Sequence, residues 1–440
     1  MPDARLQEYC VAIANEGGGH LVLGIADVAP RAVVGTTAAA DPHGMAEKLF
    51  AKLSFRVEVS AVEHPQGRVV VFAIPARLRG TAHHLDGRYL MRVGGQLLAM
   101  SQDRLRAIFA EGAPDWLQEP CRVDASAEDI IELLDTTKLF ELLQLPYPAS
   151  RAGVIDKLLA ERLIDCTGEV FRVRRIAGLL LAKRLDAFPD LARRAPRVVV
   201  YGDATKLIPR LDQIGQNGYA VGFVGLVSFV MTQLPQNEFI SEALRQERKL
   251  VPEAAIRELI ANALVHQDFN VDGMRPTIEV YANRVEITNP GVPVVPSERF
   301  IDGYQSRNDQ LADLMRRMRV CEERGSGIDR VVSLAEQWQL PAPDFRNDQN
   351  RTYAVVYGPQ PFEEMTRADR VRACYQHCVL AFITRGAMTN TTLRQRFGLA
   401  DRHAATVSLV IAATVDAELI KPDESVGDSK RYARYLPFWA

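Results

Sequence analysis

The amino-acid sequence predicts an α+β protein of several domains. Its 440 residues exceed what a single hydrophobic core usually serves. Segments with helical periodicity alternate along the chain with short strand-like runs. We place domains at residues 1–112, 241–360 and 365–440, with residues 120–240 as a connector and the front of the domain that follows it.

Composition narrows the class of protein. A hydrophobic content of 47% and a charged content of 25% are ordinary for a globular chain. The formal net charge of −2 argues against a protein that coats nucleic acid, although a local basic module remains compatible with it. Six scattered cysteines suit a reducing compartment, so we expect a cytoplasmic protein. The sequence has no apolar run long enough for a membrane span, so we expect no membrane partner.

The first domain reads as an α+β unit. A helix is expected over residues 6–14, and the glycines that follow it should end it. Strands are expected over residues 20–25, 55–62 and 68–74, with a last helix over residues 102–109.

The connector carries no recognisable chemistry. Helices are expected over residues 136–143, 149–161 and 221–234, and a strand over residues 197–201. This region should therefore position the domain that follows rather than act itself.

The helix expected around residues 257–266 is the most informative segment. Glu258, Asn262 and His266 are spaced four residues apart, so they share one helix face. A carboxylate can orient or deprotonate a water molecule, and a carboxamide oxygen can hold Mg²⁺ over phosphates. An ordinary amphipathic helix with a polar edge explains this helix alone equally well.

Two later segments favour a nucleotide site. A strand over residues 285–288 runs into Asn289-Pro290-Gly291, which we expect to form a turn. Gly325-Ser326-Gly327 then precedes an apolar-periodic helix, and a glycine-rich helix start lets backbone N–H groups approach phosphate. Such a glycine pair is by itself usually a turn, but the ordered set of helix, strand, turn and glycine-rich start is more specific.

This set resembles the GHKL-type (Bergerat) ATP-binding fold, an α/β sandwich. The resemblance implies that Glu258 is catalytic and activates water, and that Asn262 binds Mg²⁺ and ATP. It places Asn289 and Gly291 on the adenine side, where the broader class has an aspartate in place of the asparagine. It places Gly325, Ser326 and Gly327 in the loop that covers the phosphates.

The chain is most similar to the divergent bacterial members of this class that carry an N-terminal Schlafen AlbA_2 domain. Arg307-Asn308 resembles a further element of that subfamily and is assigned to ATP binding, as is His266. In the first domain the resemblance rests on Ala14-Asn15, Gly17-Gly18 and residues 92–94.

The last domain has the layout of a winged helix-turn-helix. Helices are expected over residues 371–384, 388–399 and 401–417, followed by a hairpin over residues 418–437. We expect the third helix to pack through an apolar face formed by Ala405, Leu409, Ala412 and Ala413. From residue 366 onward the chain has 11 Lys and Arg against 7 Asp and Glu, a balance that favours phosphate contacts.

The candidate DNA-binding residues lie at the start of the third helix and on the hairpin. They are Arg402, His403, Thr406, Ser408, Lys430, Arg431 and Arg434. Winged helices also serve as protein–protein or dimerisation modules, and this helix is poorer in Arg and Lys than a strong sequence reader would be.

These features predict an ATP-binding, DNA-binding regulator, either transcriptional or associated with defence, with ATP and Mg²⁺ as cofactors. Slow hydrolysis by Glu258 would make it a weak ATPase and reset the switch, and a second copy of the chain is a further candidate partner.

One alternative is an ATP-gated Schlafen-type nuclease on RNA or DNA. It is disfavoured because only Asp3 and Glu8 lie near the first helix, whereas phosphodiester cleavage normally needs clustered carboxylates. The other alternative is a non-enzymatic assembly scaffold. A helicase is disfavoured because the chain has no Gly-x-x-x-x-Gly-Lys-[Ser/Thr] loop.

Overall fold

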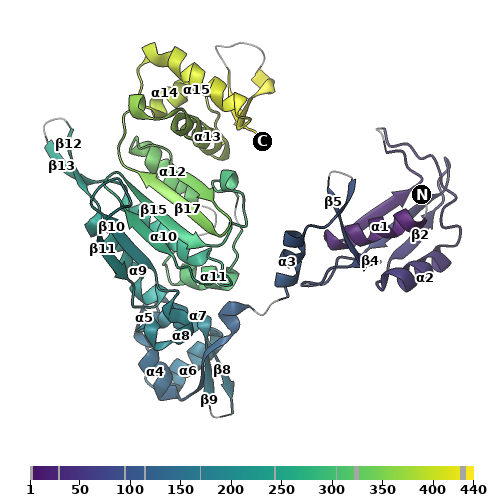
Figure 1. Ribbon diagram of the computed structural model, residues 1–440, viewed down its shortest axis with the longest axis horizontal. Coiled ribbons are helices and arrows are strands. Elements are labelled where there is room, and N and C mark those ends of the chain that lie inside the picture. The colour runs from purple at the N-terminus through teal and green to yellow at the C-terminus, as the bar shows by residue number, and fades with distance from the viewer. Residues whose placement is uncertain are drawn as a thin grey trace. The chain divides into compact units, whose positions relative to one another are not determined.

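The chain divides into two units in the computed structural model, Met1–Asp115 and Trp116–Ala440 (Figure 1). The structure describes residues 3–27, 30–93, 96–112, 115–168, 170–241, 244–303, 305–321, 327–426 and 433–440. None of the described helices is both long enough and apolar enough to cross a membrane.

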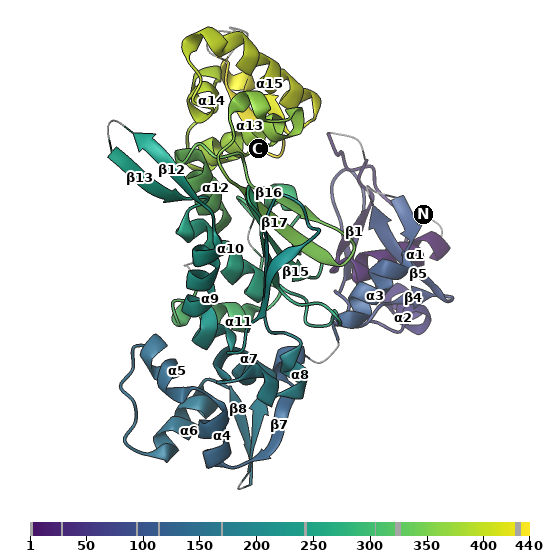
Figure 2. The same ribbon diagram turned by 60° about the vertical axis from the view of Figure 1, so that its left-hand side comes forward.

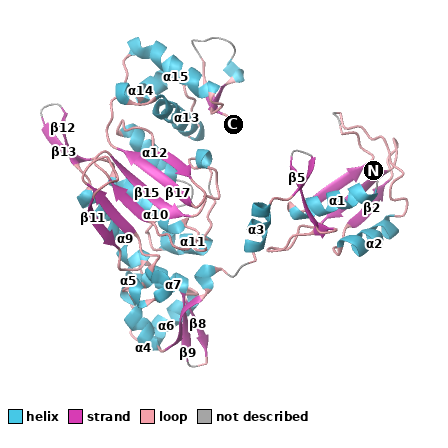
Figure 3. Ribbon diagram, in the orientation of Figure 1, coloured by secondary structure: helices cyan, strands magenta, loops and turns pink. Residues whose placement is uncertain are grey.

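The N-terminal unit packs its first helix against two small antiparallel sheets of order β1-β3-β2 and β4-β5-β6 (Figure 3). Its elements are α1 (Asp3–Asn15), β1 (Gly19–Leu23), α2 (Pro42–Leu53), β2 (Glu58–Val62), β3 (Val69–Ile74), β4 (His84–Leu85), β5 (Arg88–Val93), β6 (Gln96–Ala99) and α3 (Gln102–Ala110).

The helix stop at Asn15 is tied into this unit by its side chain. Asn15 Nδ2 donates to the carbonyls of His83 at 2.9 Å and Leu90 at 3.0 Å, and Asn15 Oδ1 accepts from the His83 N–H at 2.8 Å. Gly18 follows with φ +78°, and a Cβ there would lie 2.6 Å from the backbone nitrogen of Ala76. The asparagine and glycine that carry the resemblance in this unit therefore have a structural role in closing it.

The second unit begins with a helical part that has its own three-stranded sheet, of order β7-β9-β8. Its elements are β7 (Pro120–Ala125), α4 (Ala127–Leu133), α5 (Thr136–Leu142), α6 (Arg151–Ala160), β8 (Ile164–Thr167), β9 (Val170–Arg174), α7 (Arg175–Leu181) and α8 (Pro189–Ala192). From α4 to β9 the chain forms three helices followed by a hairpin. This is the same order of elements that the sequence predicts for the C-terminal segment.

A six-stranded sheet of order β11-β10-β14-β15-β17-β16 forms the centre of the second unit. Helices α9, α10 and α12 cover one of its faces (Figure 2). The elements are β10 (Arg197–Tyr201), β11 (Pro209–Ile214), α9 (Tyr219–Gln233), β12 (Gln236–Ser241), β13 (Leu244–Lys249), α10 (Glu253–Val265), β14 (Thr277–Val280), β15 (Arg284–Pro290), α11 (Asp309–Arg317), α12 (Gly327–Gln337), β16 (Asp344–Asn347) and β17 (Arg351–Tyr357).

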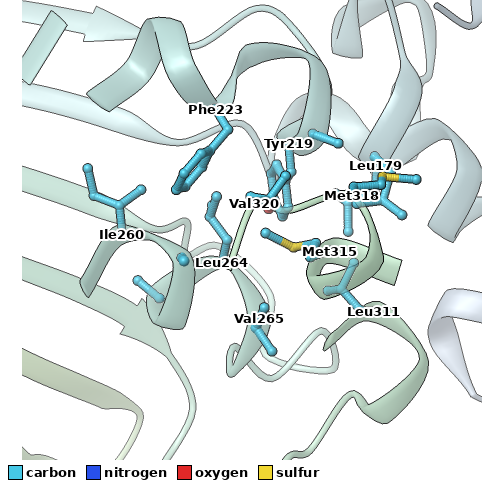
Figure 4. Close-up of a cluster of buried hydrophobic side chains, with 14 of the residues drawn as sticks. Leu179, Tyr219, Phe223, Ile260, Leu264, Val265, Leu311, Met315, Met318 and Val320 are labelled. Carbon is cyan, nitrogen blue, oxygen red and sulfur yellow. The ribbon is translucent and has the colours of Figure 1, made fainter. Parts of the chain in front are cut away.

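The core behind α10 fixes the orientation of that helix. Ile260 and Leu264 project from it into a buried cluster with residues of α9 and α11 (Figure 4). Buried apolar side chains on one side of α10 leave the opposite side, with Glu258 and Asn262, for a pocket.

The C-terminal part holds three helices and a two-stranded antiparallel sheet. They are α13 (Arg367–Ile383), α14 (Asn390–Arg396), α15 (Ala404–Asp416), β18 (Ile420–Pro422) and β19 (Tyr435–Pro437). A short 3₁₀ turn, Asp401–His403, precedes α15.

The face through which α15 packs differs from our expectation. Its buried side chains are Val407, Val410, Ile411 and Thr414. Ala405, Leu409 and Ala412, which we expected to be buried, are exposed, and Ala413 is half-buried. Val407, Val410 and Ile411 pack into one core with residues of α13 and α14, so the face that carries Leu409 is left outside.

Candidate functional site

A pocket opens between α10, the end of β15, β17 and the start of α12. Its volume is about 1340 Å³ when the open space at its mouth is included, which is large enough for a nucleotide. Six residues that the sequence singled out line it: Glu258, Asn262, His266, Asn289, Arg307 and Gly327.

Glu258 and Asn262 form a hydrogen-bonded pair at the floor of this pocket. Asn262 Nδ2 donates to Glu258 Oε1 at 3.0 Å, and this leaves Asn262 Oδ1 as the atom available to a cation. Glu258 is buried, with 7% of its surface exposed. Burial raises the pKa of the Glu258 carboxyl above its ordinary value, while the bond from Asn262 and the charge of Arg330 oppose the rise. A carboxylate with a raised pKa is a better proton acceptor than an exposed one.

The start of α12 lies directly against this pair. A Cβ built on Gly327 would collide with Glu258 Oε1 and would lie 3.6 Å from Asn262 Nδ2. A larger residue at this position would therefore require the Glu258 carboxylate to move away from the start of α12. Gly325 and Ser326, the other two residues of the predicted phosphate loop, lie outside the described residues.

His266 and Arg307 line the pocket beyond Asn262. Burial, together with the positive charge of Arg307, lowers the pKa of His266 from its ordinary 6.5, so the imidazole is neutral at pH 7. Arg307 is held in place by Asp268 at 2.8 Å and by the carbonyl of Val292 at 2.6 Å. Its guanidinium is a fixed positive charge at the pocket wall, of the kind that suits an anionic group.

The Asn289-Pro290-Gly291 segment differs in part from the predicted turn. Asn289 and Pro290 are the last residues of β15, and only Gly291 leaves the strand, with φ +99°. Asn289 is buried and lies opposite Thr352 on β17, which also lines the pocket. Thr352 Oγ1 donates to the carbonyl of Gly291 at 2.8 Å, so this hydroxyl holds the chain where it leaves the strand.

Two of the predicted site residues, Asn308 and Gly291, are not among the described residues that line the pocket. Asn308 Nδ2 donates to the carbonyls of Val265 at 2.6 Å and Gln267 at 2.8 Å, so it fixes the C-terminal end of α10. Its role in the structure is to anchor the helix that carries Glu258 and Asn262.

Sequence reasoning missed several other residues of the pocket. They include Thr352, Arg316, Asp302, Phe300 and Phe345. These residues come from strands, loops and helices that only the fold brings to α10, and no local motif marks them.

Mg²⁺ is the metal that the resemblance implies, and the side chains present fit a shared site. Among the residues that the structure describes, no group of three or more His, Cys, Asp or Glu side chains is placed to hold a metal ion. Mg²⁺ in nucleotide sites is commonly held by one or two protein oxygens together with phosphates. The free Oδ1 of Asn262 beside the Glu258 carboxylate matches that donor set.

Comparison with protein families places two modules on the chain. Residues 2–101 match the family model "Schlafen, AlbA_2", and residues 273–356 match the model "Putative ATP-dependent DNA helicase recG C-terminal". The chain carries a Schlafen AlbA_2 domain and an ATPase-type domain. The second match includes Asn289, Arg307 and Gly327 but begins after α10, so Glu258 and Asn262 lie outside it.

A crystal structure of the DIP2311 protein from Corynebacterium diphtheriae is similar to 99% of this chain and 86% of that one, at 16% identity and a TM-score of 0.46. Comparison with curated proteins gave no match. The match to an ATPase-type domain indicates ATP binding as a general function of the chain.

The residues expected to bind DNA are only partly gathered. Arg402 is exposed and His403 half-buried in the 3₁₀ turn before α15, where Arg402 Nε donates to His403 Nε2 at 3.1 Å. Ser408 is exposed but accepts from Asn390 Nδ2 at 3.0 Å, and Thr406 is half-buried. Arg434 is exposed before β19.

Two further residues assigned to the hairpin, Lys430 and Arg431, lie outside the described residues. Within the described part of α15, Lys and Arg are absent, so this helix offers the phosphate backbone little positive charge.

Proposed function

We propose that this protein is an ATP-operated switch, in which the ATPase-type domain binds ATP with Mg²⁺ and slowly hydrolyses it. The observation that carries the proposal is the hydrogen-bonded pair of buried Glu258 and half-buried Asn262, which lines one pocket with Gly327 beside it. Mg²⁺ would supply charge neutralisation to the phosphates, and Asn262 would provide its protein oxygen.

Hydrolysis requires a proton acceptor beside the terminal phosphate. Glu258 accepts the proton of a water molecule while the water oxygen bonds to the γ-phosphorus and the bond to the β–γ bridging oxygen breaks. The raised pKa of Glu258 improves it as a base. Positive charge from Arg307 at the wall favours the anionic substrate.

Two paths connect this pocket to the C-terminal helices. The first is α12, which starts at Gly327, buries Val332 in the C-terminal core, and pairs Glu336 with His377 of α13 at 3.1 Å. Helix α12 therefore contacts both the ATPase-type domain and α13. A movement of its first turn would be transmitted to α13 through these contacts.

The second path is the segment of residues 298–303. Ile301 and Asp302 line the pocket. In the same segment the guanidinium of Arg299 lies 4.2 Å from the ring centre of Trp439, and the carbonyl of Glu298 accepts from the Tyr375 hydroxyl at 2.7 Å. A bound nucleotide would therefore change the position of the C-terminal module, residues 365–440.

DNA as the target of that module stays a prediction. A helix that reads the major groove normally presents Arg, Lys, Asn or Gln to base edges. The exposed side of α15 has none of these residues, so it gives little support to DNA binding. Nuclease activity of the AlbA_2 domain likewise has no metal-binding cluster among the described residues to support it.

Calorimetric titration of ATP with Mg²⁺ tests the proposal. The wild type is expected to bind, and Asn262→Ala is expected to lose Mg²⁺-dependent binding by tenfold or more. Asn283→Ala serves as the matched control, because Asn283 is exposed at the opposite end of β15 from Asn289. No binding by a folded wild type, or equal binding by Asn262→Ala, would contradict the assignment of this pocket.

A further inference from the structure

Helix α15 presents a regular exposed ridge on the side away from its core. Five residues form the ridge, and all of them are exposed: Arg402, Ala405, Leu409, Ala412 and Asp416. Arg402 lies in the turn that leads into the helix, and Asp416 is its last residue. Leu409, at the centre, has 72% of its surface exposed, more than any other large apolar side chain of the described helices.

The spacing of this ridge is that of a helix-pairing seam. Successive members are three, four, three and four residues apart, which is the a/d pattern of helices that pack side by side. The small side chains of Ala405 and Ala412 flank Leu409, so a second helix can approach closely and accept the leucine between them. A solvated helix face has no need of such an arrangement.

The charges at the two ends of the ridge are reversed relative to the helix dipole. A cation is favoured at a helix C-terminus and an anion at an N-terminus. Here Arg402 lies at the N-terminal end and Asp416 at the C-terminal end, and neither has an ion-pair partner within the described part of the chain. The adjacent Asp401 is instead paired with Arg394.

In an antiparallel pair with a second copy of the same helix, both of these charged residues gain a partner of opposite charge. Arg402 and Asp416 each lie seven residues from Leu409. A two-fold axis at Leu409 therefore places Arg402 of one copy opposite Asp416 of the other, twice in the same contact. Each charge then also lies beside the favourable end of the opposing helix dipole.

We propose that two copies of this protein pair through antiparallel α15 helices centred on Leu409. The inference is independent of the proposed ATP site, because it rests on the ridge alone. DNA is the less suitable occupant, since a ridge of one cation, one anion and three apolar residues offers little to phosphates or base edges.

The size of the contact limits its strength. Thirteen residues of α15 make a helix about 20 Å long, so this contact belongs with small, transient interfaces rather than permanent ones. We therefore expect a dimer that forms reversibly in the micromolar range, and any further contact between copies would strengthen it.

Sedimentation velocity of the full chain, from about 1 to 200 μM, tests this pairing by reporting the dimer fraction at each concentration. Leu409→Asp is expected to weaken dimerisation by at least tenfold without lowering the melting temperature, because the side chain is exposed. Leu207→Asp is the matched control: Leu207 is 83% exposed in a loop distant in sequence, and its substitution should leave the dimer unchanged.

A charge exchange separates this geometry from other forms of association. Arg402→Glu alone and Asp416→Arg alone each place like charges opposite one another and should weaken the dimer severalfold. The double variant restores opposite charges with reversed signs and should recover most of the wild-type affinity. A wild type that stays monomeric, an unaffected Leu409→Asp, or a double variant no better than the singles would overturn the proposal. Loss of DNA binding in Leu409→Asp, with a monomeric wild type, would assign the ridge to DNA instead.

Discussion

Replacing Glu258 by glutamine isolates the base function of this residue. The amide has nearly the same size, and its Oε1 can still accept the hydrogen bond that Asn262 donates in the wild type at 3.0 Å. The floor of the pocket should therefore keep its shape while the proton acceptor is lost. ATP binding with Mg²⁺ should change by no more than about threefold, because most of the contacts of the pocket remain.

The expected loss of hydrolysis follows from the proton-transfer step. A positioned general base typically contributes 10²–10⁴-fold in rate, and this corresponds to about 3–5 kcal/mol of activation free energy. Single-turnover release of phosphate from ATP would measure it. Glu253→Gln provides the control, since Glu253 is exposed in the first turn of the same helix. Wild-type hydrolysis by Glu258→Gln would refute the assigned role.

The pH dependence supplies an independent readout. Burial raises the pKa of Glu258 above 4.5, so hydrolysis should fall on acidification at a pH higher than an ordinary glutamate would give. The same shift means that the fold disfavours the ionised carboxylate. Its cost to stability is absent below pH 4.5, grows between pH 4.5 and the raised pKa, and is fully present above the raised pKa. Glu258→Gln should therefore melt at a higher temperature than the wild type at pH 7 and at a similar temperature in acid.

Three further outcomes follow from the structure. Asn308→Ala removes two hydrogen bonds to carbonyls at the end of α10 and should lower the free energy of unfolding by about 1–3 kcal/mol in urea denaturation. Gly327→Ala should weaken ATP binding tenfold or more in calorimetry, because its methyl group would displace the Glu258 carboxylate. Gly225→Ala, where a Cβ meets nothing within 4 Å, should bind normally. ATP with Mg²⁺ should change the fluorescence of Trp439, whose ring Arg299 covers, and Trp439→Phe should abolish that part of the signal.

The helical features of the site could be predicted because helix periodicity is local. A four-residue spacing puts Glu258, Asn262 and His266 on one face wherever the helix lies, and all three line the pocket. Strand pairing is not local in the same way. Thr352 reaches the pocket because β17 pairs with β15 in a register that sets it opposite Asn289, and no signal near Thr352 in the sequence announces this.

Proximity in sequence to a pocket residue did not predict the position of Asn308. It follows Arg307 directly, yet Arg307 lines the pocket while Asn308 turns to the end of α10. Burial was equally hard to predict on α15, which has apolar residues on two sides. Only the packing against α13 and α14 decides that Val407 and Ile411 are inside and Leu409 outside.

The pocket and helix α15 are joined by one continuous packed structure. Gly327 at the start of α12 contacts Glu258, and further along α12 the side chain of Val332 lies in the same core as Val407 of α15. A packed helix of 11 residues moves as a unit, so a nucleotide that displaces its first turn biases the placement of the C-terminal module. Linkage then makes the effect reciprocal: if ATP tightens the dimer by some factor, dimerisation must tighten ATP binding by the same factor. Dimer dissociation constants with and without ATP, and ATP affinities below and above the dimerisation range, should therefore change by matching ratios. Unequal ratios would mean that the two sites do not share this element.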